Sequence, residues 1–156
     1  MTFMSPLELE LLGRIVLGFA LGGVLGWGRE RAGRPAGLRT HMLVTAGAAA
    51  YTIVSVYGFL DQGTVRDPGR VAAQIVTGIG FLGAGTIWRT PSTVLGLTTA
   101  ASIWLAAAIG MFAGTGLYLL AIVTTLLGYI CLELLRPRGR RRHGEPSITG
   151  TEPDDD

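Results

Sequence analysis

Long stretches without a charged side chain are the feature that most restricts what this chain can fold into. Residues 15–28, 41–60, 71–88 and 90–132 contain no Asp, Glu, Lys or Arg. The hydrocarbon core of a bilayer, about 30 Å thick, requires about 20 helical residues for one crossing, and the fourth stretch is long enough for two crossings. The sequence therefore predicts five transmembrane helices, over roughly residues 10–28, 41–60, 70–88, 94–113 and 117–135.

The composition supports a lipid environment. Only 15% of the 156 residues are charged and the mean hydropathy is +0.46, whereas a soluble domain carries about 25% charged residues. The apolar stretches lack the alternating pattern of a transmembrane barrel, so helices are the spanning structure that satisfies the backbone. The fold class is therefore predicted to be all-α, a polytopic membrane protein built as a bundle of five transmembrane helices.

The arginine positions predict the orientation in the membrane. All 13 basic residues are arginines, and most fall in segments 29–40, 89–93 and 136–142, which share one side of a five-span protein. Only Arg66 and Arg70 fall in loops on the other side. By the positive-inside rule, we expect the N-terminus outside and the C-terminus in the cytoplasm. Arg14 lies inside the first span, four residues after Glu10, and is expected to pair with it.

Two parts of the chain differ in composition. Residues 10–135 are predicted to form the transmembrane domain, and residues 136–156 a disordered cytoplasmic tail that is first basic and then acidic. The first apolar stretch is preceded by Glu8 and Glu10 rather than by a basic cluster. We therefore expect it to be a retained span and not a cleaved signal peptide.

The sequence offers no arrangement for catalysis or for a cofactor. It has neither a P-loop nor an HExxH motif, and Ser102 has no base on its own helix. Residues 78–83 spell GxGxxG, but no acidic residue follows about 20 positions later and no strand is expected before them, as a dinucleotide site would require. The single Cys131 excludes a Cys-based zinc site. We therefore predict a protein that is not an enzyme, takes no cofactor and binds neither nucleotides nor nucleic acid.

Small residues recur at helical spacing in the first and third predicted spans, where they let helix backbones approach closely in lipid. The predicted helix-packing positions are Gly18, Gly22, Gly26, Gly78, Gly80, Gly83 and Gly85. We expect these glycines to hold the bundle together. In a homo-oligomer, the helix faces that carry these glycines would be the contacts between protomers.

Three blocks of the sequence resemble the MgtC/SapB family of bacterial inner-membrane proteins. They are RERAGRPAGLRTH at 29–41, DPGRVAAQIVTGIGFLGAG at 67–85 and GLTTAASIW at 96–104. The resemblance implies a five-helix protein of the bacterial inner (plasma) membrane that is tied to magnesium limitation, acid stress and intracellular survival. One branch of the family is described as restraining the proton-driven ATP synthase. The resemblance does not imply ATP hydrolysis.

This chain departs from the family pattern at two positions and in its tail. The family usually has an acidic residue where this chain has Gly28, and a basic residue where it has Leu95. Glu30 is a candidate replacement for the first of these charges. Many members continue into a cytoplasmic ACT-like domain, and the short tail here resembles the membrane-only branch.

The resemblance points to seven candidate functional residues. They are Arg29, Glu30, Arg39 and Thr40 on the cytoplasmic side, and Asp67, Arg70 and Gln74 at the outer end of the third span. These residues also have structural interpretations. Asp67 followed by a proline is a good helix cap, and Gln74 suits a hydrogen bond between helices. The charged residues of the cytoplasmic group are also explained as charges that only set the orientation in the membrane. Arg39 and Thr40 together suit an anion clamp. The motifs do not indicate whether any of these residues binds a metal ion.

The expected function is that of a non-catalytic inner-membrane protein that supports magnesium or acid-stress homeostasis. Its expected partners are the lipid bilayer and another membrane component, which it binds or modulates. The alternative is a small oligomeric channel or transporter for an ion or small solute.

Overall fold

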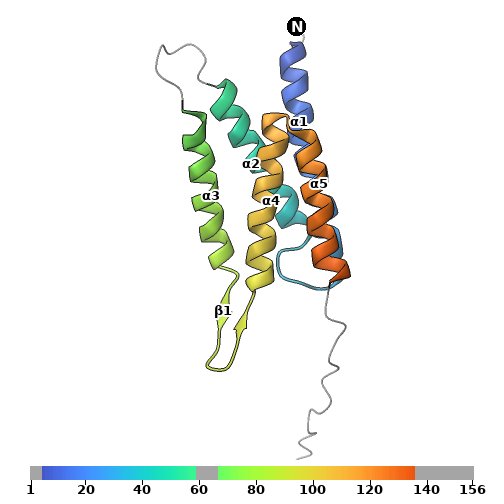
Figure 1. Ribbon diagram of the computed structural model, residues 1–156, viewed down its shortest axis with the longest axis vertical. Helices are drawn as coiled ribbons and strands as arrows, with labels where there is room; N and C mark the ends of the chain where they lie inside the picture. The colour runs from blue at the N-terminus through green and yellow to red at the C-terminus, as the bar shows by residue number, and fades with distance from the viewer. Residues whose placement is uncertain (1–4, 59–66, 136–156) are drawn as a thin grey trace, which may run out of the picture.

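The computed structural model of the chain describes residues 5–58 and 67–135. Within these residues it contains five α-helices, which confirms an all-α fold (Figure 1). The helices are α1 (Pro6–Arg31), α2 (Leu38–Tyr57), α3 (Pro68–Ala84), α4 (Leu97–Thr115) and α5 (Tyr118–Tyr129), and α5 continues into a short π-helix, η1 (Ile130–Leu134). The predicted tail 136–156 lies outside the described residues.

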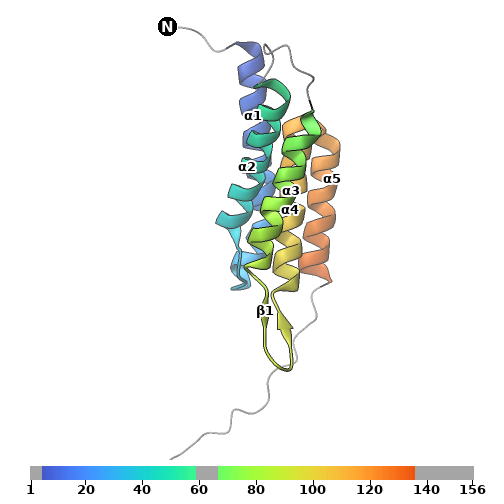
Figure 2. The same cartoon turned by 90° about the vertical axis from the view of Figure 1, so that its left-hand side faces the viewer.

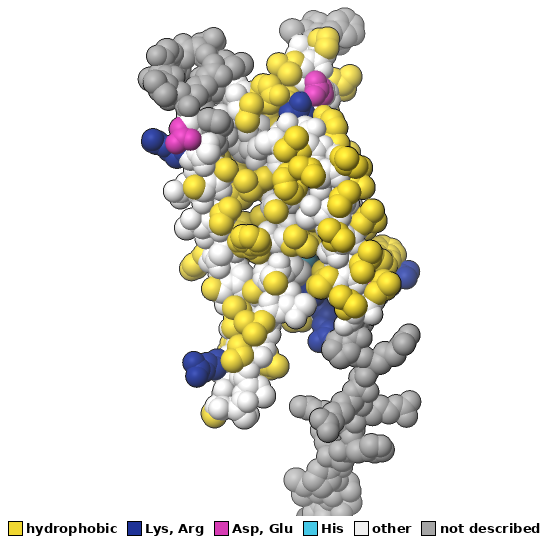
Figure 3. All heavy atoms as spheres, in the orientation of Figure 1, with side chains coloured by type: hydrophobic (Ala, Val, Ile, Leu, Met, Phe, Trp, Pro, Cys, Tyr) yellow, Lys and Arg dark blue, Asp and Glu magenta, His cyan; other side chains and the backbone are white. Residues whose placement is uncertain are grey.

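Two of the described helices, α1 and α4, are long and apolar enough to cross a membrane by length and composition. The continuous helix from Tyr118 to Leu134 is also apolar but shorter. Figure 3 shows the charged side chains of one face gathered toward the two ends of the bundle, with hydrophobic side chains between them. Helices α2 and α3 lie at predicted positions, and their crossing of a membrane stays a prediction.

Local signals explain where the helices begin. At the start of α1, the Ser5 hydroxyl accepts from the Glu8 amide while the Glu8 carboxylate accepts from the Ser5 amide. This capping box, followed by a proline, starts α1 at residue 6 rather than at the predicted residue 10. Gly116 has a φ of +84°, a backbone conformation that favours glycine, and it makes the sharp turn between α4 and α5.

A small β-hairpin, which the sequence analysis did not predict, separates α3 from α4 (Figures 1 and 2). Its strands β1 (Trp88–Arg89) and β2 (Val94–Leu95) pair antiparallel, with Trp88 opposite Leu95. The Thr90 amide donates to the Thr93 carbonyl oxygen at 2.8 Å, which closes the turn. The third helix therefore ends at residue 84 instead of 88, and the fourth begins at 97 instead of 94, because residues 88–95 follow strand and turn preferences rather than helical ones.

Helix α2 packs mainly against α1 and α4. Glycines on both neighbours allow this close packing: a Cβ added at Gly18 would lie 3.3 Å from the Thr45 carbonyl oxygen, and one added at Gly26 would lie 2.8 Å from the Gly37 carbonyl oxygen. From α4, a Cβ added at Gly114 would lie 2.7 Å from the Ala49 carbonyl oxygen. Backbone therefore approaches backbone on both sides of α2.

Helix α3 is the least covered helix of the described bundle. Of its side chains outside Pro68, only Ile75 is buried, and Gly83 is the one buried glycine. A Cβ at Gly83 would lie 3.6 Å from Ala100, an ordinary contact with α4, but one at Gly78 or Gly80 would meet no atom within 4 Å. Gly85 faces only the end of its own helix. The structure thus does not place Gly78, Gly80 or Gly85 at a helix contact within the described chain.

Candidate functional site

A buried arginine organises one end of the bundle, where α1 ends and α4 begins. The Arg29 side chain is only 4% exposed. Its Nε donates to the Ala36 carbonyl oxygen at 3.0 Å, and its Nη2 donates to the Pro35 carbonyl oxygen at 2.8 Å and to Thr99 Oγ1 at 2.7 Å. One guanidinium therefore joins α1, the loop after it and the first turn of α4. All three acceptors are neutral.

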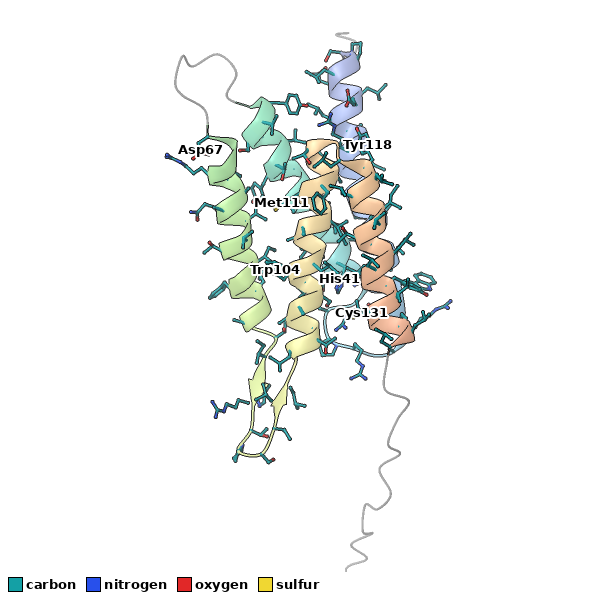
Figure 4. The ribbon with its side chains drawn as sticks, viewed as in Figure 1. His41, Asp67, Trp104, Met111, Tyr118 and Cys131 are labelled. Carbon is teal, nitrogen blue, oxygen red and sulfur yellow. The ribbon has the colours of Figure 1, made fainter. Side chains whose placement is uncertain are left out.

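A second buried pair lies beside Arg29 and connects α2 to α4. The Nδ1 of His41 lies 2.9 Å from the Gly37 carbonyl oxygen, and its Nε2 lies 3.1 Å from the Ser102 hydroxyl. The Ser102 hydroxyl also donates to the Thr99 carbonyl oxygen at 2.8 Å. Figure 4 shows His41 inside the bundle. His41 and Ser102 are almost completely buried, so the pair supports helix packing and offers no access to a substrate.

A cavity of about 590 Å³ opens next to Arg29. Its charged lining comes from Arg29, from Arg34 in the loop after α1, and from Glu133 in η1. A Cβ added at Gly28 would fall on the carboxylate of Glu133, so this carboxylate occupies the side-chain space of residue 28. The motif that this chain resembles usually has an acidic residue at position 28. A carboxylate does lie in that space, but it comes from η1, 105 residues further along the chain. Leu95, the second departure, lines the same cavity.

The other three residues predicted for the cytoplasmic side do not line the cavity beside Arg29. Glu30 Oε2 accepts from the Leu38 amide at 2.9 Å, which holds the start of α2. Arg39 is exposed and Thr40 is half-buried, and neither lines the cavity beside Arg29. Of the four candidates predicted for this side, the structure therefore brings only Arg29 to that cavity.

The three predicted residues at the opposite end lie along α3. Asp67 caps the helix, because its Oδ1 accepts from the Gly69 amide at 3.0 Å, and Figure 4 shows it at the start of α3. Asp67 and Arg70 are both exposed, and they form no ion pair within 4.0 Å. Gln74 is exposed and lines an apolar groove of about 520 Å³ between α2 and α3. The structure thus does not bring these three side chains together into one site.

Arg14 organises the end of the bundle nearer to Asp67. Its Nη2 donates to Glu10 Oε1 at 2.6 Å, which confirms the predicted pair. Its Nη1 donates to the Gly114 carbonyl oxygen at 3.0 Å and to the Tyr57 hydroxyl at 3.2 Å. The side chain thus connects α1 with the ends of α2 and α4. Its Nε is buried without a hydrogen-bond partner among the described residues.

Sequence reasoning missed Glu133 and the partners of Arg29 and His41. Thr99 and Ser102 do belong to the third family-like block, but their spacing gives no sign of which helix they meet. In the described part of the chain, no three His, Cys, Asp or Glu side chains gather as metal ligands. The charged cavity holds two guanidinium groups and one carboxylate, a combination that suits an anion better than a cation.

Comparisons with known proteins agree with these motifs. The model of the MgtC family matches residues 15–141. The chain is 45% identical over 129 residues to a protein of Escherichia coli K12 named "Putative magnesium transporter YhiD", covering 80% of this chain and 60% of that protein. It is 47% identical over 119 residues to protein MgtC of Brucella abortus strain 2308, and 42% identical over 138 residues to protein MgtC of Salmonella typhimurium.

These matches cover 76% and 88% of this chain, but 48% and 56% of the two MgtC proteins. The chain therefore spans about half to three fifths of the length of these curated relatives. No solved structure matches the chain. The family match extends over most of the sequence and includes all three motif blocks, so this chain belongs to the MgtC family.

Proposed function

We propose that this chain is a non-catalytic inner-membrane protein that supports magnesium or acid-stress homeostasis by binding or modulating another membrane component. The name of the Escherichia coli relative supports the link to magnesium. In this proposal the bundle crosses the membrane five times, with its N-terminus outside and its C-terminus in the cytoplasm. The clustering of arginines at segments 29–40, 89–93 and 136–142 supports this orientation.

The poor covering of α3 is the observation that carries the proposal of a membrane partner. This helix contains most of the longest family-like block, residues 67–85, yet few of its side chains contact the rest of the chain. A Cβ added at Gly78 or Gly80 would meet no described atom of the chain within 4 Å. A helix face with small residues lets a second transmembrane helix approach closely. We therefore infer that α3 is the face that receives the partner.

The experiment replaces Gly80 by leucine in a strain that depends on this protein for growth in low magnesium. A Cβ at Gly80 would meet no described atom within 4 Å, so we expect Gly80→Leu to leave membrane abundance unchanged. It should nevertheless reduce growth, because it blocks the close approach of another helix. The matched control is Gly13→Leu on α1, since a Cβ at Gly13 also has nothing within 4 Å. Normal growth of Gly80→Leu would refute a partner at this face.

A photo-reactive amino acid at Thr77 distinguishes the proposed partner from the alternative function. Thr77 is exposed on α3, and exposed Ile122 on α5 provides the control position. A cross-linked product that contains a different membrane protein supports the modulator. A product with twice the mass of the chain supports the oligomeric channel or transporter, which the groove between α2 and α3 also favours. Ion movement in liposomes by the purified oligomer would then test transport directly.

A further inference from the structure

We propose that the cavity beside Arg29 binds the phosphodiester headgroup of a membrane phospholipid. The inference concerns the cavity lined by Arg29, Arg34 and Glu133, and it is independent of the partner proposed for α3. It rests on four observations: the buried charge, the composition of the charged lining, the position of Glu133, and the apolar rim.

The buried charge is the first observation. Arg29 is 4% exposed, and its three hydrogen-bond acceptors are two backbone carbonyls and the hydroxyl of Thr99. Among the described residues, no carboxylate lies within 4.0 Å of it, since the one ion pair there is Arg14 with Glu10. These acceptors orient the guanidinium, but none of them carries a negative charge. A buried cation next to an open cavity favours an anionic ligand.

The charged lining limits the charge of that ligand. Among the described lining residues, Arg29 and Arg34 contribute two positive charges and Glu133 one negative charge, a formal excess of one positive charge. A phosphodiester carries a single negative charge, which matches this excess. Guanidinium groups hold phosphate oxygens through charge-assisted hydrogen bonds. Glu133 would repel a second negative charge, and it offers an acceptor to the hydroxyl or ammonium group of a lipid headgroup.

The position of Glu133 shows that the carboxylate belongs to the cavity wall. It lies in the space that a side chain at residue 28 would fill, and a Cβ there would overlap its carboxylate. Glu133 lines the same cavity as Arg29. Gly28 therefore allows η1 to deliver its carboxylate next to α1.

The rim of the cavity is apolar and lies at the level where a membrane interface is expected. Exposed leucines line it at Leu95, Leu97 and Leu135, where they offer a surface for acyl chains. At the same end of the bundle, the Arg31 guanidinium lies over the Trp27 ring, 4.7 Å from its centre. Tryptophan and arginine together are typical of the headgroup region of a bilayer. A lipid bound here would therefore have its phosphate in the cavity and its chains against the bundle.

Native mass spectrometry of the full chain in a mild detergent tests the proposal, with dioleoylphosphatidylglycerol as the probe. Dioleoylglycerol, which lacks the phosphate, and inorganic phosphate, which lacks the chains, are the comparison ligands. We expect one phosphatidylglycerol per chain, bound at least about tenfold more tightly than dioleoylglycerol, as one charge-assisted hydrogen bond to phosphate would give.

Arg34→Gln should weaken phosphatidylglycerol binding about tenfold without harming the fold, because Arg34 is exposed. The matched control is Arg39→Gln, an exposed arginine of the same end of the bundle that does not line the cavity, and it should retain binding. Glu133→Gln should shift the preference several-fold toward dioleoylphosphatidic acid, whose phosphate can carry a second negative charge.

Three results would overturn the proposal: equal losses in the two arginine variants, equal binding of dioleoylglycerol, or binding of inorganic phosphate with no lipid adduct.

Discussion

Adding one methyl group at Gly22 should destabilise the bundle, whereas the same addition at Gly23 should not. A Cβ at Gly22 would lie 2.5 Å from the His41 carbonyl oxygen and would overlap the Thr45 hydroxyl. That hydroxyl donates to the same carbonyl at 2.9 Å, so α1 must move away from α2 or the hydrogen bond must break. At Gly23, the nearest atom would be the Met42 Cγ at 3.7 Å, an ordinary contact with a flexible side chain.

The magnitude follows from two opposing effects. Overpacking costs about 1–3 kcal/mol, and the upper part of this range applies at Gly22 because the obstacle is backbone. Replacing a helical glycine by alanine contributes about 0.5–1 kcal/mol of stability at either position. We therefore expect Gly22→Ala to lower the free energy of unfolding by about 1–2 kcal/mol and Gly23→Ala to raise it by about 0.5–1 kcal/mol.

Reversible unfolding in mixed micelles, followed by circular dichroism as the fraction of denaturing detergent rises, measures both variants. Their difference, about 2–3 kcal/mol, isolates the packing effect, because both variants gain the same helix propensity. Equal midpoints for the two variants would show that α1 does not press against α2 at Gly22, and the reasoning from backbone contact would fail.

Three further predictions concern the cap, the orientation and the carboxylate beside Arg29. Asp67→Asn should retain wild-type membrane abundance and growth in low magnesium, whereas Asp67→Ala should lose about 0.5–2 kcal/mol and show lower abundance; growth failure of Asp67→Asn would instead indicate a working charge. A reporter active only in the periplasm should be silent when fused after Arg142 and active at Gly63, and the reverse pattern would contradict the orientation. Gly28→Ala should destabilise the protein when Glu133 is present, and should destabilise it less in a Glu133→Ala background. A double-mutant cycle should give a coupling free energy of about 1 kcal/mol between the two positions. Additive effects of the two substitutions would mean that the two side chains do not contact each other.

The helix positions could be predicted because they depend on local chemistry. Uncharged stretches and the glycine turn at Gly116 identify helices and their breaks without any knowledge of packing. Residues 89–93 were expected to form a loop, but the hairpin was missed because its two strands are only two residues long and show no alternating pattern. Arg89 and Pro91 interrupt the apolar stretch, but they indicate only that the helix has ended and not that a hairpin follows.

The candidate site was predicted only in part, because its members come from opposite ends of the chain. Arg29 was identified within its own motif, and capping was one of the two roles considered for Asp67, which the sequence analysis named as a candidate functional residue. Glu133, however, contacts the space at Gly28 from 105 positions further along the chain, and no local pattern connects the two residues. Gly110 and Gly114 were not among the predicted packing positions, because their contact with α2 depends on how the helices are arranged in the bundle.

The glycines of α1 and the position of Arg29 depend on each other through one short loop. Gly26 allows the backbone of Gly37 and Leu38 to lie against α1, with a Cβ at Gly26 only 2.8 Å from each. That contact fixes the end of the loop whose Pro35 and Ala36 carbonyls hold the Arg29 guanidinium. A charge can be held buried in this way only where its acceptors cannot move, because unpaired burial of a guanidinium is costly. The close packing of α1 on α2 therefore fixes the position of Arg29 beside its cavity, whereas α3 contributes no residue to the lining of that cavity.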